Sequence, residues 1–216
     1  MKEADIYFHI GTMKTGTTFL QRNVFPFFKG VDYYHTDGRK FHWKRPITRK
    51  TLVSIEKLSG DPHVNSLDTR RFWAYWIHYN YPNAKIIVFF RIRNWQDSLY
   101  STYIKDGGIL KYKDWRVQVF NEDYLRFYWY IKLLQELFSE VLIIQYEDFK
   151  HDNYKTICRI CDFMHIKKPE WYDMRQVGKS MSGYRLEILR WLNFLPVKRI
   201  HFVKWLDKLK LRGKIE

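Results

Sequence analysis

A short segment near the start of the chain, residues 11–18 with the sequence GTMKTGTT, has the residue types of an anion-binding loop. It follows an apolar run of strand length, and a segment with helical spacing begins at Thr17. Where a strand passes through a glycine loop into a helix, free N–H groups and the positive end of the helix dipole converge. Lys14 adds a cation. The pattern therefore predicts an anion site that needs few dedicated side chains.

The position of Lys14 distinguishes this loop from that of nucleotide triphosphate-binding proteins. Their loop reads GxxxxGK(S/T), with lysine directly after the second glycine, whereas Lys14 stands two positions before Gly16. We therefore expect the ammonium to lie over the anion rather than beside a metal ion. The alternative interpretation is an incidental glycine turn with a surface lysine.

A second polar group follows the apolar run 85–91 and reads RNWQDSLYS from Arg93 to Ser101. A strand that ends in aspartate would suit magnesium, but this run ends in arginine, so its terminus favours an anion. A guanidinium group and a hydroxyl together suit a phosphate dianion. Arg91 is a second candidate for this role. Taken alone, Arg93 and Ser101 would more often be a surface arginine and a helix serine.

Together, the two motifs resemble those of sulfotransferases that use 3′-phosphoadenosine 5′-phosphosulfate (PAPS). The family's phosphosulfate loop has the form G-x-x-K-S/T-G-T-S/T, and its 3′-phosphate motif has the form R-N-x-x-D-x-x-x-S. The resemblance implies that the loop binds the 5′-phosphosulfate and that Lys14 is catalytic. It also implies that Arg93 and Ser101 bind the 3′-phosphate. The matching residues are Gly11, Lys14, Thr15, Gly16, Thr17 and Thr18, with Thr12 inside the loop, and Arg93, Asn94, Asp97 and Ser101.

The resemblance also assigns roles to residues outside these motifs. Tyr146 corresponds to a tyrosine near the donor's adenine, although an aromatic residue at the end of a core strand is equally explained by packing. Ser54 and Glu56 match a Ser-x-Glu beside the acceptor in bacterial members, which makes Glu56 the first candidate for the base. A plain ion pair with the loop lysine is its alternative role. His35 is the second candidate, whereas His9 lies within the first strand and should be buried.

The apolar pattern predicts strands alternating with helices, hence an α/β fold with a parallel sheet. The resemblance implies a three-layer P-loop-like sulfotransferase fold with about five strands and ligands at their carboxyl ends. We expect one domain, residues 1–216, since this length buries a core without disulfides. The predicted strands are 5–10, 51–55, 85–91 and 141–146, and the predicted helices are 16–28, 68–80, 94–106, 121–138, 152–165, 182–194 and 198–211.

Lysine and arginine outnumber aspartate and glutamate by 38 to 23, which gives a net charge of +15. This charge favours polyanionic partners without choosing among them. No apolar run reaches the length of a membrane span, so we expect a cytoplasmic protein. Residues 196–216 should form a basic amphipathic helix that either contacts the inner membrane face or packs on the domain. Cys158 and Cys161 lie in a helical pattern and are interpreted as half-buried thiols rather than redox or zinc groups.

The resemblance implies sulfuryl transfer from PAPS to a hydroxyl or amine, without a metal. The resemblance covers about residues 5–195 and favours a carbohydrate or glycolipid acceptor near the loop 37–50. The sequence has no match to the C-terminal phosphate loop of animal cytosolic members. Further 3′-phosphate contacts by Lys179, Ser180 or Arg185 therefore stay open. The alternatives are a P-loop nucleotide or sugar kinase and a non-catalytic polyanion-binding module. No nucleic acid partner is expected, and the oligomeric state is not predicted.

Overall fold

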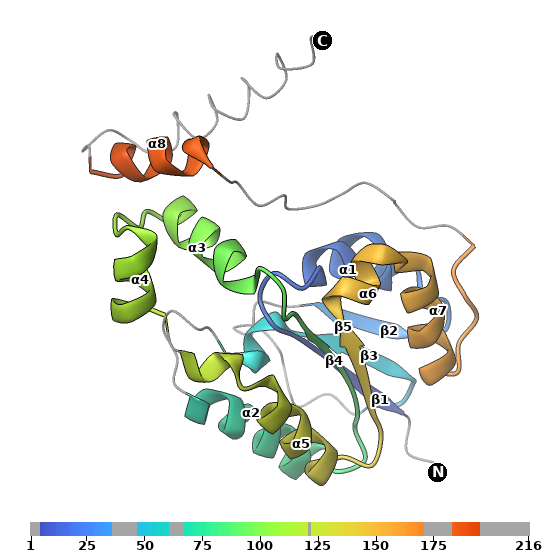
Figure 1. Ribbon diagram of the computed structural model, residues 1–216. Coiled ribbons are helices and arrows are strands. Elements are labelled where there is room, and N and C mark those ends of the chain that lie inside the picture. The colour runs from blue at the N-terminus through green and yellow to red at the C-terminus, as the bar shows by residue number, and fades with distance from the viewer. Residues whose placement is uncertain (1–4, 36–46, 61–66, 121, 171–182, 195–216) are drawn as a thin grey trace.

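The computed structural model describes residues 5–35, 47–60, 67–120, 122–170 and 183–194 (Figure 1). Its centre is a parallel five-stranded sheet with the order β2-β3-β1-β4-β5. Helices cover both faces, so the predicted three-layer α/β fold is confirmed. The strands are β1 (Ile6–Gly11), β2 (Asp32–His35), β3 (Thr51–Ser54), β4 (Lys85–Phe90) and β5 (Val141–Gln145).

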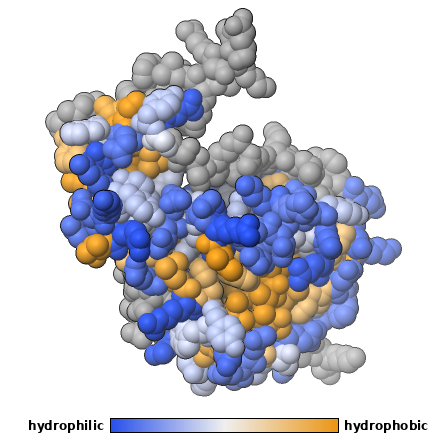
Figure 2. Space-filling model, in the orientation of Figure 1, coloured by the Kyte–Doolittle hydropathy of each residue, from blue (hydrophilic) through white to orange (hydrophobic). Residues whose placement is uncertain are grey.

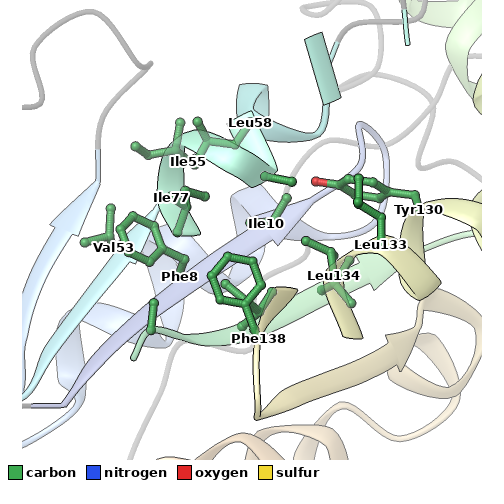
Figure 3. Close-up of a cluster of buried hydrophobic side chains, with 14 of the residues drawn as sticks. Phe8, Ile10, Val53, Ile55, Leu58, Ile77, Tyr130, Leu133, Leu134 and Phe138 are labelled. Carbon is green, nitrogen blue, oxygen red and sulfur yellow. The ribbon is translucent and has the colours of Figure 1, made fainter. Parts of the chain in front are cut away.

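Residues of β1 alternate between the two faces of the sheet, as the period of a strand requires. Phe8 and Ile10 enter the apolar cluster beneath α2 (Leu67–Asn80) and α5 (Phe127–Leu137). Tyr7 enters the cluster on the opposite face. Because both faces are covered, β1 is buried along its whole length. Figure 3 shows the first cluster, whose labelled members are Phe8, Ile10, Val53, Ile55, Leu58, Ile77, Tyr130, Leu133, Leu134 and Phe138.

Three helices cover the opposite face of the sheet (Figure 1). They are α1 (Thr17–Asn23), α6 (Tyr146–His151) and α7 (Asn153–Phe163). A third apolar cluster joins α3 (Trp95–Lys105), α4 (Tyr112–Gln118) and α8 (Tyr184–Leu192). None of the described helices is long and apolar enough to cross a membrane.

The strand order places β1 between two halves of the sheet. From β1 the chain continues into β2 and β3 on one side, and later into β4 and β5 on the other. At such a switch point, the loops at the carboxyl ends diverge and leave a crevice for a ligand. Gly11, the last residue of β1, is paired in register with Phe89 of β4 and marks this point.

Several predicted boundaries differ from the structure. Strand β2 was not predicted, because its polar sequence DYYH lacks an apolar run. Helix α1 ends at Asn23, because Pro26 lies in the separate 3₁₀ helix Phe25–Phe27. Helix α4 was also not predicted, and the helix expected at 121–138 begins at Phe127 after the 3₁₀ helix Glu122–Leu125.

Other predictions are confirmed or fall outside the described chain. The helices expected at 152–165 and 182–194 are α7 and α8. Cys158 and Cys161 lie in α7, the first half-buried and the second buried. The helix predicted at 198–211 and most of the loop 37–50 lie outside the described residues.

Candidate active site

The glycine loop between β1 and α1 is held by one hydrogen bond to β4 and one within the loop. The Thr12 N–H donates to the Phe89 carbonyl at 3.1 Å, and the Thr15 hydroxyl donates to the Thr12 carbonyl at 2.6 Å. Lys14 and Gly16 have left-handed backbone conformations, with φ of 66° and 80°. The first N–H groups of a helix have no partner within it, and no side chain of the described chain caps α1. The loop therefore leads into a helix N-terminus that is open to an anion.

Both glycines of the loop are required by geometry. A Cβ atom on Gly11 would lie 1.8 Å from the Thr17 side chain. A Cβ atom on Gly16 would lie 2.5 Å from the Phe149 ring, and its left-handed conformation also disfavours other residues. The spacing of the two glycines thus reflects close packing of the loop on α1 and α6.

Two side chains near the end of β4 hold the outer carbonyls of the loop. The Trp95 indole N–H donates to the Met13 carbonyl at 2.7 Å, and the Arg91 guanidinium donates to the Lys14 carbonyl at 3.2 Å. These two bonds fix the backbone of the loop, and the first N–H groups of α1 beyond it have no partner within the helix. The sequence did not reveal these contacts, which join residues 77 and 82 positions apart.

Lys14 is half-buried and lies among several charges. Burial lowers the pKa of its ammonium below the usual lysine value. The carboxylates of Glu56 and Asp106 oppose this lowering of the Lys14 pKa, and the Arg91 charge adds to it. Asp106, directly after α3, was not singled out in the sequence, although it is a carboxylate at the start of the glycine turn KDGG.

Glu56 is placed by the short 3₁₀ helix Glu56–Ser59, which is tied to the end of β1. The Ser59 hydroxyl lies 2.8 Å from the Gly11 carbonyl and 3.0 Å from the Glu56 carbonyl. The fully buried Arg70 donates from Nε to the Ser59 carbonyl at 2.6 Å, and its guanidinium lies over the rings of Phe127 and Tyr130. These contacts hold Glu56 at the same edge of the sheet as Lys14.

His9 and His35 differ in burial, and His9 lies inside the protein as predicted. His35 is exposed at the end of β2, where it pairs in register with Ser54. His9 is completely buried, with Nδ1 2.7 Å from the Ser54 hydroxyl, and burial lowers its pKa to about 3. Ser54 also accepts a hydrogen bond from Gln21 at 3.0 Å and is itself fully buried. In this structure the Ser54 hydroxyl belongs to the core, and its position beside an acceptor stays a prediction.

The second motif forms the turn from β4 into α3. Arg93 is exposed, and Asn94 is the residue before α3, with a left-handed φ of 51° and no side-chain hydrogen bond to the helix. The Arg93 N–H donates to the Glu147 carboxylate at 2.8 Å. Ser101 lies on α3 and is only 1% exposed. The structure thus places Arg93 at the carboxyl edge of the sheet but buries its predicted partner within α3.

Tyr146 begins α6 rather than ending β5. The guanidinium of Arg91 lies 4.6 Å from the centre of its ring. One face of Tyr146 is therefore covered by a side chain of the protein, and only the rest of the ring is left to contact a nucleotide base.

Among the residues that the structure describes, no three histidine, cysteine, aspartate or glutamate side chains group as a metal site would require.

An α/β fold that presents an uncapped helix N-terminus and basic turns at the carboxyl edge of its sheet belongs to the broad class that binds phosphate or sulfate esters there. A model of the sulfotransferase domain matches residues 5–182. The chain therefore belongs to the sulfotransferase family, whose members transfer sulfuryl groups.

Two solved structures are similar to this chain. The sulfotransferase from Alicyclobacillus acidocaldarius has 16% sequence identity and a TM-score of 0.58, over 80% of this chain and 85% of that chain. The mouse sulfotransferase SULT7A1 complexed with PAP has 17% identity and a TM-score of 0.46, over 88% of this chain and 64% of that chain. None of the curated proteins matches this chain in sequence.

Proposed function

We propose that this protein transfers a sulfuryl group from PAPS to a hydroxyl or amine of an acceptor. The observation that carries the proposal is Lys14, half-buried in a braced glycine loop at the open N-terminus of α1. A cation and free N–H groups at this point would neutralise negative charge that develops on a leaving phosphate. Membership of the family supports the same reaction.

The donor would lie along the carboxyl edge of the sheet. Its 5′-phosphosulfate would be bound by residues 11–18, and its 3′-phosphate by Arg93 and Ser101. Since the Thr12 and Thr15 hydroxyls donate to backbone carbonyls, these two residues would serve the donor through the backbone. Tyr146 would contact the adenine with the part of its ring that Arg91 leaves uncovered.

The reaction would be an in-line displacement at sulfur. The acceptor oxygen or nitrogen forms a bond to sulfur while the bond from sulfur to the bridging phosphate oxygen breaks. The electron pair stays on that oxygen, where Lys14 and the loop N–H groups stabilise it. Glu56 would take the acceptor's proton, with His35 as the second candidate. The products are the sulfated acceptor and adenosine 3′,5′-bisphosphate (PAP).

We also propose a carbohydrate or glycolipid as acceptor. This rests on the resemblance of residues 179–193 to bacterial glycan-modifying members of the family. Helix α8 contains most of these residues. A kinase is disfavoured by the position of Lys14 and by the arginine that follows β4, where magnesium would need a carboxylate.

Transfer is tested by mass spectrometry of a glycan panel incubated with the protein and PAPS. The expected result is a sulfated glycan together with PAP, without added metal. Phosphorylated products formed only with ATP and magnesium would overturn the proposal in favour of a kinase. Preference for DNA over PAP in a binding titration would instead favour a polyanion-binding module.

The assignment of the 3′-phosphate site has its own test. Arg93→Ala and Ser101→Ala should weaken binding of PAP more than binding of adenosine 5′-phosphate (AMP), which lacks that phosphate. Ser98→Ala is the matched control, because Ser98 is also a buried serine of α3. Equal weakening of both ligands in calorimetry would show that Arg93 and Ser101 are structural.

A further inference from the structure

We propose that Arg91 is a positioning residue that holds the Lys14 loop and the Arg93 turn in one fixed arrangement, so that the two phosphate sites act as a unit. The identity of the ligand rests on the proposed function, but the contacts do not. Arg91 is the first residue after β4 and is half-buried.

One guanidinium joins segments that follow three different strands. Its Nε donates to the Arg93 carbonyl at 2.8 Å, and its Nη1 donates to the Lys14 carbonyl at 3.2 Å. Its flat face lies over the ring of Tyr146, with 4.6 Å from the guanidinium carbon to the ring centre. Thus the end of β4 is fastened to the loop after β1 and to the helix that follows β5.

The backbone of Arg93 is held from both sides. Arg91 binds its carbonyl, and the Glu147 carboxylate accepts from its N–H at 2.8 Å. Burial raises the pKa of Glu147. Hydrogen bonds to the carboxylate, the largest of them from the Arg93 N–H, lower this pKa by more. The pKa of Glu147 therefore lies below the usual glutamate value. The carboxylate is therefore ionised at neutral pH, and the exposed Arg93 side chain projects from a fixed peptide.

The loop has further supports that do not depend on Arg91. The Trp95 indole and the Thr12 N–H each form a separate hydrogen bond between the loop and the β4 region. Replacing Arg91 should therefore leave the fold and the loop in place. What it removes is the link between the Lys14 carbonyl and the Arg93 carbonyl.

Both the shape and the charge of the side chain matter. A planar guanidinium can donate in two directions while it stacks on an aromatic ring, whereas a lysine ammonium cannot reproduce this geometry. The positive charge has a separate effect, because it contributes to the lowered pKa of Lys14. Arg91→Lys keeps the charge and loses the fork, while Arg91→Met loses both.

A ligand that carries both phosphates should depend most on the fixed spacing. We expect Arg91→Met and Arg91→Lys to weaken PAP binding by about 10-fold or more, because a site that is no longer pre-organised must order its two halves when the ligand binds. AMP, which lacks the 3′-phosphate and so does not join the two phosphate sites, should lose only a small factor. Arg71→Met is the matched control, since the guanidinium of Arg71 in α2 also lies over an aromatic ring, that of Trp129 in α5.

The charge gives a second readout that a purely structural role would not move. Glu56, Asp106 and Arg91 all act on the pKa of Lys14. Removing the Arg91 charge raises that pKa, so the alkaline loss of activity should move to higher pH in Arg91→Met but stay in place in Arg91→Lys.

Hydrogen exchange separates failure of this proposal from failure of the proposed function. In the ligand-free protein, the Arg93 N–H, which donates to the Glu147 carboxylate, should exchange faster in both Arg91 variants than in the wild type and in Arg71→Met, because Arg91 no longer holds the Arg93 carbonyl. Unchanged exchange, or equal losses for PAP and AMP, would overturn the role of Arg91. If the wild type binds neither nucleotide, the proposed donor is overturned. Faster exchange in the Arg91 variants would in that case still support the positioning role of Arg91.

Discussion

Two residues other than glycine have left-handed backbone conformations at the candidate site, Lys14 and Asn94. Such a conformation costs on the order of 1 kcal/mol and persists only where surrounding contacts enforce it. For Lys14 those contacts are the hydrogen bond from Arg91 to its carbonyl and the bond from Trp95 to the preceding carbonyl. The direction of the lysine side chain is therefore set by the loop, which suits a cation that must meet a charge at one point.

Replacing Lys14 by alanine should lower the turnover number by ~10²-fold or more, because one electrostatic contact to the leaving oxygen is lost. The wild-type enzyme should also lose activity as the pH rises, and earlier than an ordinary lysine would allow, since burial lowers the pKa of Lys14. Rates measured against pH, with circular dichroism to verify folding, provide the test. Near-normal turnover by a folded Lys14→Ala protein would contradict the role of this residue.

Replacing Glu56 by glutamine should lower the turnover number by ~10²-fold or more with PAP affinity unchanged, because glutamine keeps the shape but cannot accept a proton. Asp106→Asn and His35→Asn are the informative comparisons, since Asp106 is the other carboxylate that acts on Lys14. An active Glu56→Gln enzyme beside an inactive His35→Asn enzyme would assign the proton to His35. Weakened PAP binding in Glu56→Gln would indicate a plain ion pair instead.

At the scale of elements, buried strands were the most predictable feature. The apolar runs of β1, β3 and β4 could be recognised because these strands are buried on both faces of the sheet, and the edge strand β5 keeps an apolar run although it is mostly half-buried. The edge strand β2 is half-exposed and has no such run. Tyr146 begins α6 instead of ending β5, and no local pattern separates these two outcomes. Gly11, Glu56 and Arg93 lie at or just after the ends of parallel strands, which meet at the carboxyl edge of the sheet. Their grouping could therefore be predicted from the sequence.

The contacts that shape the site were not predictable in the same way. Arg91 and Trp95 bind carbonyls of a loop that lies far away in the sequence, and side-chain contacts to the backbone leave no periodic signal. In the sequence, Arg70 is one of several charged residues of α2. In the structure it is fully buried and donates to the Ser59 carbonyl. Spacing revealed which residues meet at the edge of the sheet, but only packing shows what holds them there.

The buried histidine of β1 makes stability depend on pH. The pKa of His9 is about 3 in the folded protein, below its ordinary value of 6.5. Between these values an unfolded chain binds a proton that the folded chain excludes, so stability falls as the pH drops below 6.5, by at most about 1.4 kcal/mol per pH unit. His9→Gln, which does not titrate, should remove this part of the slope.

Urea unfolding between pH 8 and pH 4 measures the slope. His151→Gln is the control, because His151 is exposed at the end of α6. Equal pH dependence in the wild type and in His9→Gln would show that His9 is not the group responsible.

On the scale of the whole molecule, helix α8 presents two different faces. Leu186 and Leu189 are buried in the third apolar cluster, and Asn193 donates to the carbonyls of Ile104 and Gly108 at 2.9 and 2.7 Å. The outer face carries exposed apolar residues, and Figure 2 shows apolar and pale side chains in this part of the surface. The exposed residues are Tyr184, Ile188 and Trp191, and Phe194 is exposed just beyond the end of the helix.

The sequence beyond α8 is basic and lies outside the described residues. It contains six lysines and arginines between Pro196 and Gly213, interleaved with apolar residues. An amphipathic basic helix binds anionic membranes through its apolar face and its charges together, with about 1 kcal/mol for each lysine or arginine near the surface. If residues 196–216 act in this way, the exposed face of α8 extends the same surface. The alternative is that they pack on the domain.

Truncation after Pro196 distinguishes these two outcomes. For a membrane-binding segment, the full chain should co-sediment with vesicles that contain anionic lipid, binding should weaken as salt increases, and the truncated chain should stay in the supernatant. Trp191→Ala should weaken sedimentation of the full chain without changing its charge, because Trp191 is 63% exposed on α8. Sedimentation that truncation does not change would rule out a membrane role for the segment. Lower stability of the truncated chain in urea, with no vesicle binding by either form, would show that the segment packs on the domain.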